Sequence, residues 1–192
     1  MFEKLYNTLS PVAKGRYIWP GLVLIVLFNI VFFPLPRKII LKEDTLSGNL
    51  LDTKMLYSPN EAYELIASYG DDARMLYWKM ALVIDNPYAV VYGLALMLIL
   101  IFSFSKVFPG NRLLKKLAFL PVLGALFDIM ENGSISYLVI SFPEQYIGVA
   151  KFASFCTSVK WVLLGASVLL LLISTSKLLL RNDHSVPNEG RL

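Results

Sequence analysis

Four apolar stretches, each about 20 residues or longer, limit the folds that this chain can adopt. They cover about residues 17–36, 76–105, 117–140 and 146–173. A helix of about 20 apolar residues spans the roughly 30 Å hydrocarbon core of a bilayer, and a soluble domain does not need several such runs. Hydrophobic residues make up 56% of the chain and charged residues only 17%. The sequence therefore predicts an all-α, polytopic membrane protein, a four-transmembrane-helix bundle.

The first apolar run is predicted to be a membrane span that is not cleaved. It is longer than the roughly 7–15 residues of a signal-peptide core, and no small-x-small cleavage site follows it. We therefore expect residues 1–16 to form an N-terminal arm and residues 17–176 to form a single transmembrane domain. The polar composition of residues 177–192 predicts a disordered tail.

The loop after the first apolar run contains the start signal of a short helix. Ser58 and Glu61 have the spacing of a capping box, Pro59 stands at the first helical position, and Gly70 is typical of a helix end. These signals predict an amphipathic helix over about 59–69. It would either lie at the membrane surface, over the bundle, or pack on its neighbours as an ordinary loop helix. The apolar side of this helix carries Ala62, Leu65, Ile66 and Tyr69.

The placement of Lys and Arg predicts the orientation. Three lie in the N-terminal arm, four in the turn between the second and third runs and two directly after the last run, whereas the turn between the third and fourth runs has none. Because cytoplasmic segments retain an excess of Lys and Arg, both termini are predicted to lie in the cytoplasm, with the protein in the plasma membrane. Arg37, Lys38 and Lys42 count against this orientation, and Glu43 and Asp44 do little to offset them.

Ionisable side chains lie inside the predicted spans, where each costs about 2.5–3.5 kcal/mol near the centre of a helix. Such residues are kept where they find partners or water. Helical spacing of about 100° per residue groups them with polar neighbours on the same helix faces. The predicted site comprises Asp85, Tyr88 and Tyr92 in the second span, Asp128, Glu131 and Asn132 in the third and Lys160 in the fourth, and Asn29 of the first could join them.

The predicted site holds three carboxylates and one ammonium. Polar contacts between membrane helices average only about 0.6 kcal/mol, so helix packing alone is a weak reason to bury them, although a purely structural network is an alternative. The acid excess implies a protonated carboxyl, a bound cation, a cationic ligand or a water-filled cavity. We predict a pocket, open toward the extracytoplasmic side, that binds or transports a lipid or a small cationic amphiphile. We predict no cofactor and no metal site, because the chain has one cysteine, Cys156, and one histidine, His184.

Two other functions are compatible with the same residues. Asp128 and Glu131 could act as acid and base of an intramembrane enzyme on a lipid or isoprenoid, assisted by Tyr88 or Lys160. Alternatively, the chain is an accessory subunit whose polar groups contact a partner span. The expected partners are membrane lipids, an amphiphilic ligand, a second copy or another membrane protein. Nucleic acid is not expected, because its recognition requires a basic face on a soluble fold.

Three motifs occupy the middle half of the chain: Tyr57-Ser58-Pro59 with Glu61-Ala62-Tyr63, Asp85-Asn86-Pro87-Tyr88, and Phe127-Asp128 followed by Glu131-Asn132. They resemble a pattern in a family of small, uncharacterised bacterial four-span membrane proteins. The resemblance implies a four-span fold and no activity. A looser similarity to sterol-isomerase and sigma-receptor-like proteins concerns architecture alone, and a fold does not determine a function.

Overall fold

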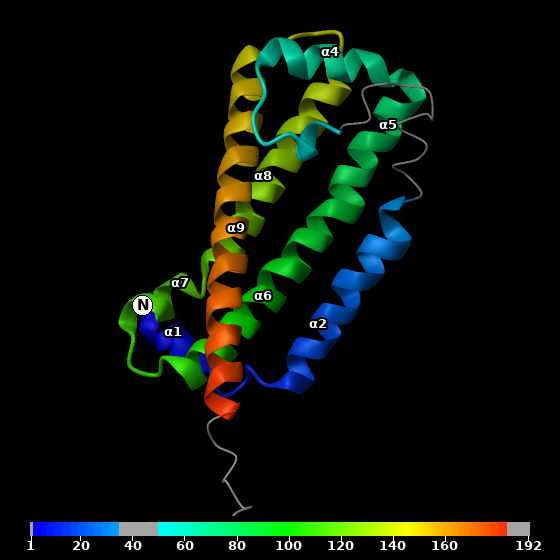
Figure 1. Ribbon diagram of the computed structural model, residues 1–192. Helices are drawn as coiled ribbons and strands as arrows, with labels where there is room; N and C mark the ends of the chain where they lie inside the picture. The colour runs from blue at the N-terminus through cyan, green and yellow to red at the C-terminus, as the bar shows by residue number, and fades with distance from the viewer. Residues whose placement is uncertain (1, 35–49, 184–192) are drawn as a thin grey trace, which may run out of the picture.

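The computed structural model describes residues 2–34 and 50–183, and these residues form helices and short turns with no strand among them (Figure 1). The N-terminal part contains α1 (Phe2–Leu9) and α2 (Gly15–Leu27), which continues into a π-helical turn, η1 (Phe28–Phe32). A 3-10 turn, η2 (Leu51–Thr53), precedes α4 (Pro59–Tyr69). The remaining elements are α5 (Asp71–Met80), the π-helical turn η3 (Ala81–Asp85), α6 (Asn86–Val107), α7 (Arg112–Leu117), α8 (Leu120–Ile140) and α9 (Ile147–Asp183).

Three helices within the described ranges are long and apolar enough to cross a membrane. They are Gly15–Phe32, which joins α2 to η1, then Asp71–Val107, which joins α5, η3 and α6, and Ile147–Leu178 within α9. The 21 residues of α8 match the length of a span, but α8 is not among the three. Asp128, Glu131 and Asn132 lower its mean hydropathy.

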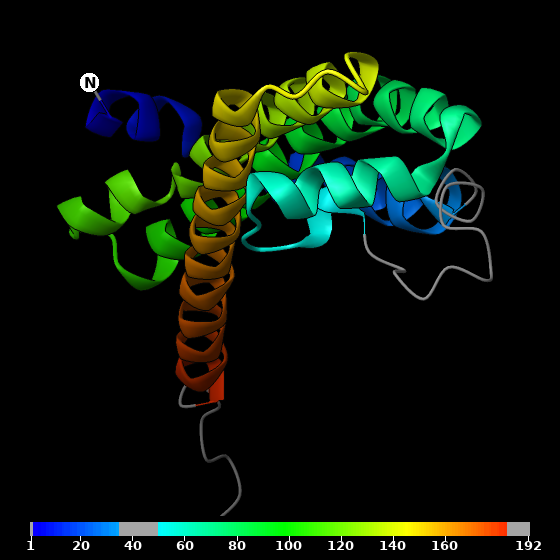
Figure 2. The same ribbon diagram turned by 90° about the horizontal axis from the view of Figure 1, so that it is seen from above.

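The long helices pack side by side, with the shorter ones at the two ends. α8 packs against α5, α6 and α9, and α2 packs against α6. α1 and α7 pack on each other beside the end where α6 finishes, and α4 crosses the opposite end (Figure 1). Seen from above, α1 and α7 project from the side of the helical assembly (Figure 2). Buried apolar clusters therefore form at both ends, around α4 and around α1.

Glycines allow the closest helix contacts. A Cβ atom on Gly21 of α2 would lie 2.8 Å from the Cβ of Ala95, and one on Gly93 of α6 would lie 2.8 Å from the Cβ of Ala125. Neither contact is possible for a larger residue without movement of the backbone. Helix interfaces in membranes are enriched in small residues for this reason, since they let two backbones approach.

The capping box of α4 forms as the sequence predicts. The Ser58 hydroxyl accepts from the Glu61 N–H at 3.3 Å, and the Glu61 carboxylate accepts from the Ser58 N–H at 2.7 Å. The hydrogen bond from the Ser58 backbone, followed by that from its side chain, lowers the pKa of Glu61 because both stabilise the carboxylate. The helix packs on α5 and α9, and Tyr63 Oη accepts from the Tyr146 N–H at 2.5 Å. The predicted bounds, 59–69, are confirmed.

Two helix starts differ from the prediction. The second long helix begins at Asp71 rather than near residue 76, because Gly70, with a φ of 78°, ends α4 and turns the chain directly into α5. The third begins at Leu120 rather than near residue 117. The residues before it form the separate helix α7, which starts where the Asn111 side chain accepts from the N–H groups of Leu113 and Leu114.

The two termini also differ from the prediction. The N-terminal arm contains α1, whose Tyr6 is buried and donates a hydrogen bond to the Ile101 carbonyl at 3.1 Å. The last helix continues to Asp183, so residues 177–183 are helical rather than disordered. The rest of the predicted tail with His184, and the charged residues Arg37, Lys38, Lys42, Glu43 and Asp44, lie outside the described residues.

Candidate functional site

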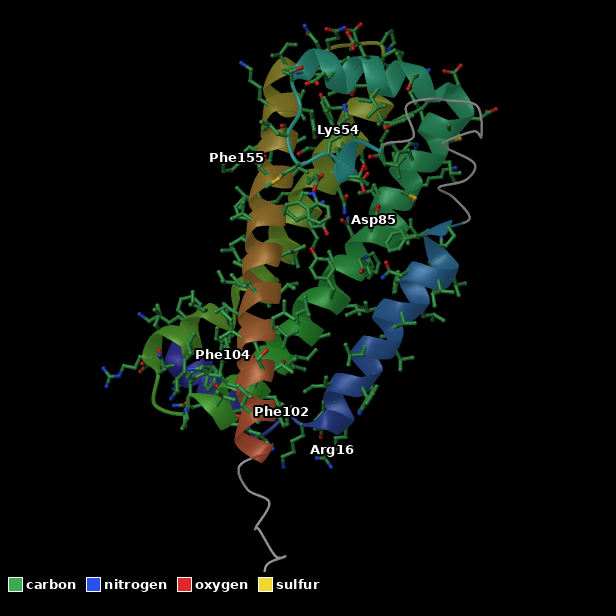
Figure 3. All side chains as sticks on the ribbon, in the orientation of Figure 1. Arg16, Lys54, Asp85, Phe102, Phe104 and Phe155 are labelled. Atoms are coloured by element: carbon green, nitrogen blue, oxygen red, sulfur yellow. The ribbon has the colours of Figure 1, made fainter. Side chains whose placement is uncertain are left out.

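A cavity of about 1050 Å³ lies between α2 and α9, with α6 and α8 behind it. Figure 3 shows Asp85 on the part of the long α5–α6 helix that faces this space. Six of the predicted site residues line the cavity, together with Asn29. They are Asp85, Tyr88, Tyr92, Asp128, Asn132 and Lys160.

Lys160 of α9 pairs with both carboxylates of α8. Its Nζ lies 2.5 Å from Glu131 Oε2 and 3.3 Å from Asp128 Oδ1, and the third contact, at 3.5 Å, is to the carbonyl oxygen of Asp52. The ammonium therefore forms two ion pairs and also donates to a backbone carbonyl. The ionic partners of this deep lysine are thus two carboxylates of the neighbouring helix.

Hydroxyl groups complete the pairing of these carboxylates. Tyr92 Oη donates to Asp128 Oδ2 at 2.8 Å, and Thr157 Oγ1 donates to Glu131 Oε1 at 2.7 Å. Each carboxylate therefore has the ammonium at one oxygen and a hydroxyl at the other. This network joins α6, α8 and α9 at the wall of the cavity.

The sequence predicts Glu131 as a ligand-binding residue, but its side chain does not line the cavity. That side chain is fully buried. The helical spacing is right, but Lys160 and Thr157 draw this carboxylate into the contact between α8 and α9. Its role in the structure is to hold Lys160.

Asp85 has a different environment. Its side chain is only 8% exposed and lines the cavity, yet Oδ2 has no hydrogen-bond partner among the described residues. It is the last residue of η3, and Pro87, which has no N–H, follows two residues later. The π-helical turn moves Asp85 out of α-helical register, and such turns occur frequently at functional sites.

A second π-helical turn faces the first across the cavity. Asn29 lies in η1, and its Nδ2 donates to Tyr88 Oη at 3.0 Å and to the Ile25 carbonyl at 2.8 Å. Asn29 thus joins the site, as predicted, and ties α2 to α6. Asn132 makes the corresponding contact from α8, where its Nδ2 donates to Asn86 Oδ1 at 3.1 Å.

Asp52 was not predicted as a site residue, although it lines the cavity. Its Oδ1 accepts from Tyr77 Oη at 2.9 Å. The segment that carries it is held against α9, because the Tyr57 N–H donates to Ser154 Oγ at 3.0 Å and Ser158 Oγ donates to the Met55 carbonyl at 2.8 Å. The sequence offers no signal for this placement, since Asp52 stands in a polar loop without periodicity.

Charged and polar groups lie toward one end of the cavity, where Phe33, Pro34, Leu50 and Met80 also line it, and the lining of the other end is apolar. On α6, Leu96 lies about 16 Å beyond Asp85, and on α9, Val168 lies about 12 Å beyond Lys160, at a rise of about 1.5 Å per residue. α6 and α9 run toward the same end of the molecule, so both apolar residues lie on the same side of the charged groups (Figure 1). The apolar wall comprises Ile25, Leu96, Leu164 and Val168.

Such a cavity can hold a molecule with a polar head and an apolar body. Ligand pockets in proteins measure about 300–1,000 Å³ and combine apolar walls with a few polar groups. Comparison of the chain with protein-family models, with curated proteins and with solved structures finds no match.

Proposed function

We propose that this chain is a four-span integral membrane protein of the plasma membrane whose cavity binds a lipid or another single-chain amphiphile. The observation that carries the proposal is the cavity of about 1050 Å³, with carboxylates and an ammonium at one end and aliphatic side chains at the other. The shape and polarity of this space match those of an amphiphile better than those of a small polar metabolite, which would leave the apolar end unfilled.

The distribution of side chains around α8 supports its assignment as a membrane span in addition to the other three. Its polar residues Asp128, Glu131 and Asn132 are all buried within the helical assembly. Its outward face is apolar, with Leu123, Leu126 and Met130 each more than two-fifths exposed. A helix that is polar inside and apolar outside fits a lipid surrounding, because ionisable residues in membranes face the interior of the bundle.

The charges at the two ends support the proposed orientation. One end carries the N-terminus of α2 with Arg16, the end of α6, helix α7 and the end of α9, while α4 lies at the other (Figures 1 and 3). We assign the basic end to the cytoplasm. The cavity then lies toward the extracytoplasmic half, below α4. The basic residues are Lys4, Lys14, Arg16, Lys106, Arg112, Lys115, Lys116 and Lys177.

Partly exposed cavity residues support entry from the bilayer. On α9, Trp161 and Val168 line the cavity and are 42% and 46% exposed, and on α2 the exposed Asn29 lines the facing edge. A molecule that diffuses in the membrane could therefore pass between α2 and α9 without crossing water. Membrane lipids are the partners that such an opening would meet first.

The contacts of the α8 carboxylates favour binding over acid–base catalysis. Asp128 and Glu131 share one ammonium, and each also accepts from a hydroxyl. A general acid and a general base need different surroundings, whereas these two carboxyl groups contact the same ammonium. These two residues thus support the cavity wall.

The proposal predicts that filling the apolar end removes the bound amphiphile. Val168→Trp would place an indole in the cavity, whereas Val162→Trp, on the same helix and also exposed, lies outside the cavity lining. We expect native mass spectrometry of the purified protein to detect a one-to-one complex with a single-chain amphiphile. Binding should weaken by about tenfold or more in Val168→Trp, which loses contact area in the pocket, and stay unchanged in Val162→Trp.

Two results would contradict this function. One is a parent protein that forms no one-to-one complex, either as purified or after addition of single-chain lipids. The other is equal binding by the two tryptophan variants, which would place the amphiphile on the outer surface.

A further inference from the structure

We infer that the amphiphile carries a primary or secondary ammonium head group and that Asp85 is its counter-ion. This inference rests on the proposed function, because it names the chemistry of the head group that the cavity would take.

The polar end of the cavity holds more carboxyl groups than the cationic side chains of the described residues pair with. Asp52, Asp85 and Asp128 line it, Glu131 lies behind it, and Lys160 is the one cationic side chain among the described residues of its lining. Lys160 is already engaged, because it forms ion pairs with Glu131 and Asp128 and donates to the carbonyl oxygen of Asp52. An additional negative charge at this end therefore needs a cation from elsewhere.

Asp85 is the carboxylate that lacks such a cation. It is more than nine-tenths buried, lines the cavity, and leaves Oδ2 without a hydrogen bond among the residues described. A buried carboxylate is stable when a charge and hydrogen-bond donors compensate it, and otherwise it takes up a proton. Rotation about the Cβ–Cγ bond exchanges the two oxygens, so either can face a ligand.

The groups next to Asp85 select among cationic ligands. Tyr88 and Tyr92 follow it on the same helix, with ring centroids 5.3 Å apart, and the aliphatic wall begins beyond them. These neighbours favour a cation attached to an apolar chain. A primary or secondary ammonium supplies both a positive charge and an N–H donor for Oδ2, whereas a quaternary ammonium has no N–H and an alcohol has no charge. An anionic head group would be repelled by the surrounding carboxylates.

Dodecylamine, dodecanol and dodecyltrimethylammonium test this assignment, because they share one chain and differ at the head. We would measure one-to-one binding by native mass spectrometry with the full chain in phosphatidylcholine nanodiscs. The parent should bind dodecylamine at least tenfold more tightly than the other two. Asp85→Asn should reduce dodecylamine binding to the level of dodecanol and leave dodecanol binding unchanged.

The control is Asp72→Asn, which removes an exposed acid near the start of the same long helix and should leave all three affinities unchanged. Asp85→Asn should be at least as stable to heat as the parent, because it removes an uncompensated charge. Comparing the three ligands on the parent protein already tests the preference for an ammonium head group, so the test does not depend on folding of the variant.

The outcomes separate the two proposals. Equal binding of dodecylamine and dodecanol by the parent, or full dodecylamine binding by Asp85→Asn, overturns the ammonium assignment while the amphiphile pocket stands. Tighter binding of dodecyltrimethylammonium than of dodecylamine also overturns it, since no N–H donor would then be needed. If none of the three binds the parent, the ammonium assignment is overturned, and if in addition no lipid copurifies in a one-to-one complex, the proposed function itself fails.

Discussion

Among single residues, Lys160 has the most demanding position, because its ammonium is the shared partner of two carboxylates on the neighbouring helix. Glu131 is fully buried, and Asp128 and Lys160 are nearly so. Each charge in such a cluster is tolerable only while its partners are present, and removing one partner of a buried pair costs about 3–5 kcal/mol. The network therefore fixes how α8 meets α9.

We predict that Lys160→Met lowers the free energy of unfolding by about 3–5 kcal/mol, because it leaves Asp128 and Glu131 close together without a cation. Thermal unfolding of the purified protein in detergent would measure the loss. Lys151→Met, an exposed lysine on the same helix, is the matched control and should unfold like the parent. Combining Lys160→Met with Asp128→Asn and Glu131→Gln should restore most of the stability. Equal melting temperatures for Lys160→Met and Lys151→Met would contradict this account.

The sequence predicts site residues that lie on regular helices and misses those placed by tertiary contacts. Asp128, Asn132 and Lys160 could be grouped because a helix repeats its faces at a fixed angle. Asp52 could not, because its position depends on hydrogen bonds from Tyr57 and Ser158 that hold its segment to α9. Because Asp52 also lines the cavity, the number of carboxyl groups there is larger than the sequence predicts.

At the scale of elements, small residues set the distance between the long helices. A Cβ on Gly93 would lie 2.8 Å from Ala125 Cβ, so α6 and α8 meet almost backbone to backbone. We predict that Gly93→Leu lowers the free energy of unfolding by about 1–3 kcal/mol or more, because the added side chain forces the two helices apart. Thermal unfolding and size-exclusion chromatography would measure the effect.

The matched control for this change is Gly165→Leu on α9. Nothing lies within 4 Å of a Cβ at that position, so the same added volume should cost little. If Gly93→Leu and Gly165→Leu unfold at the same temperature, the small size of Gly93 is not needed for the packing of α6 on α8.

Element boundaries follow local signals where these exist. The start of α4 was predictable because Ser58, Pro59 and Glu61 satisfy the helix end with their own atoms. A proline marks both π-helical turns, because Pro87 stands two residues after the end of η3 and Pro34 stands two residues after the end of η1. α1 was missed although Phe2, Leu5, Tyr6 and Leu9 have helical spacing, because a helix this short is stabilised by its packing on α7 rather than by its own sequence.

For the whole molecule, the deciding question is whether α8 crosses the bilayer, since the four-span topology and the position of the cavity both depend on it. Single cysteines at Asp72, Gly110 and Gln145, in a background where the buried Cys156 is changed to Ser, report on the three connections, because all three positions are exposed. In intact cells, a membrane-impermeant maleimide should label Asp72→Cys and Gln145→Cys, while Gly110→Cys should react only after permeabilisation. If Gly110→Cys and Gln145→Cys react from the same side, α8 does not cross. The reverse pattern would keep four spans and invert the molecule, so that the basic end would face outward against the usual charge rule.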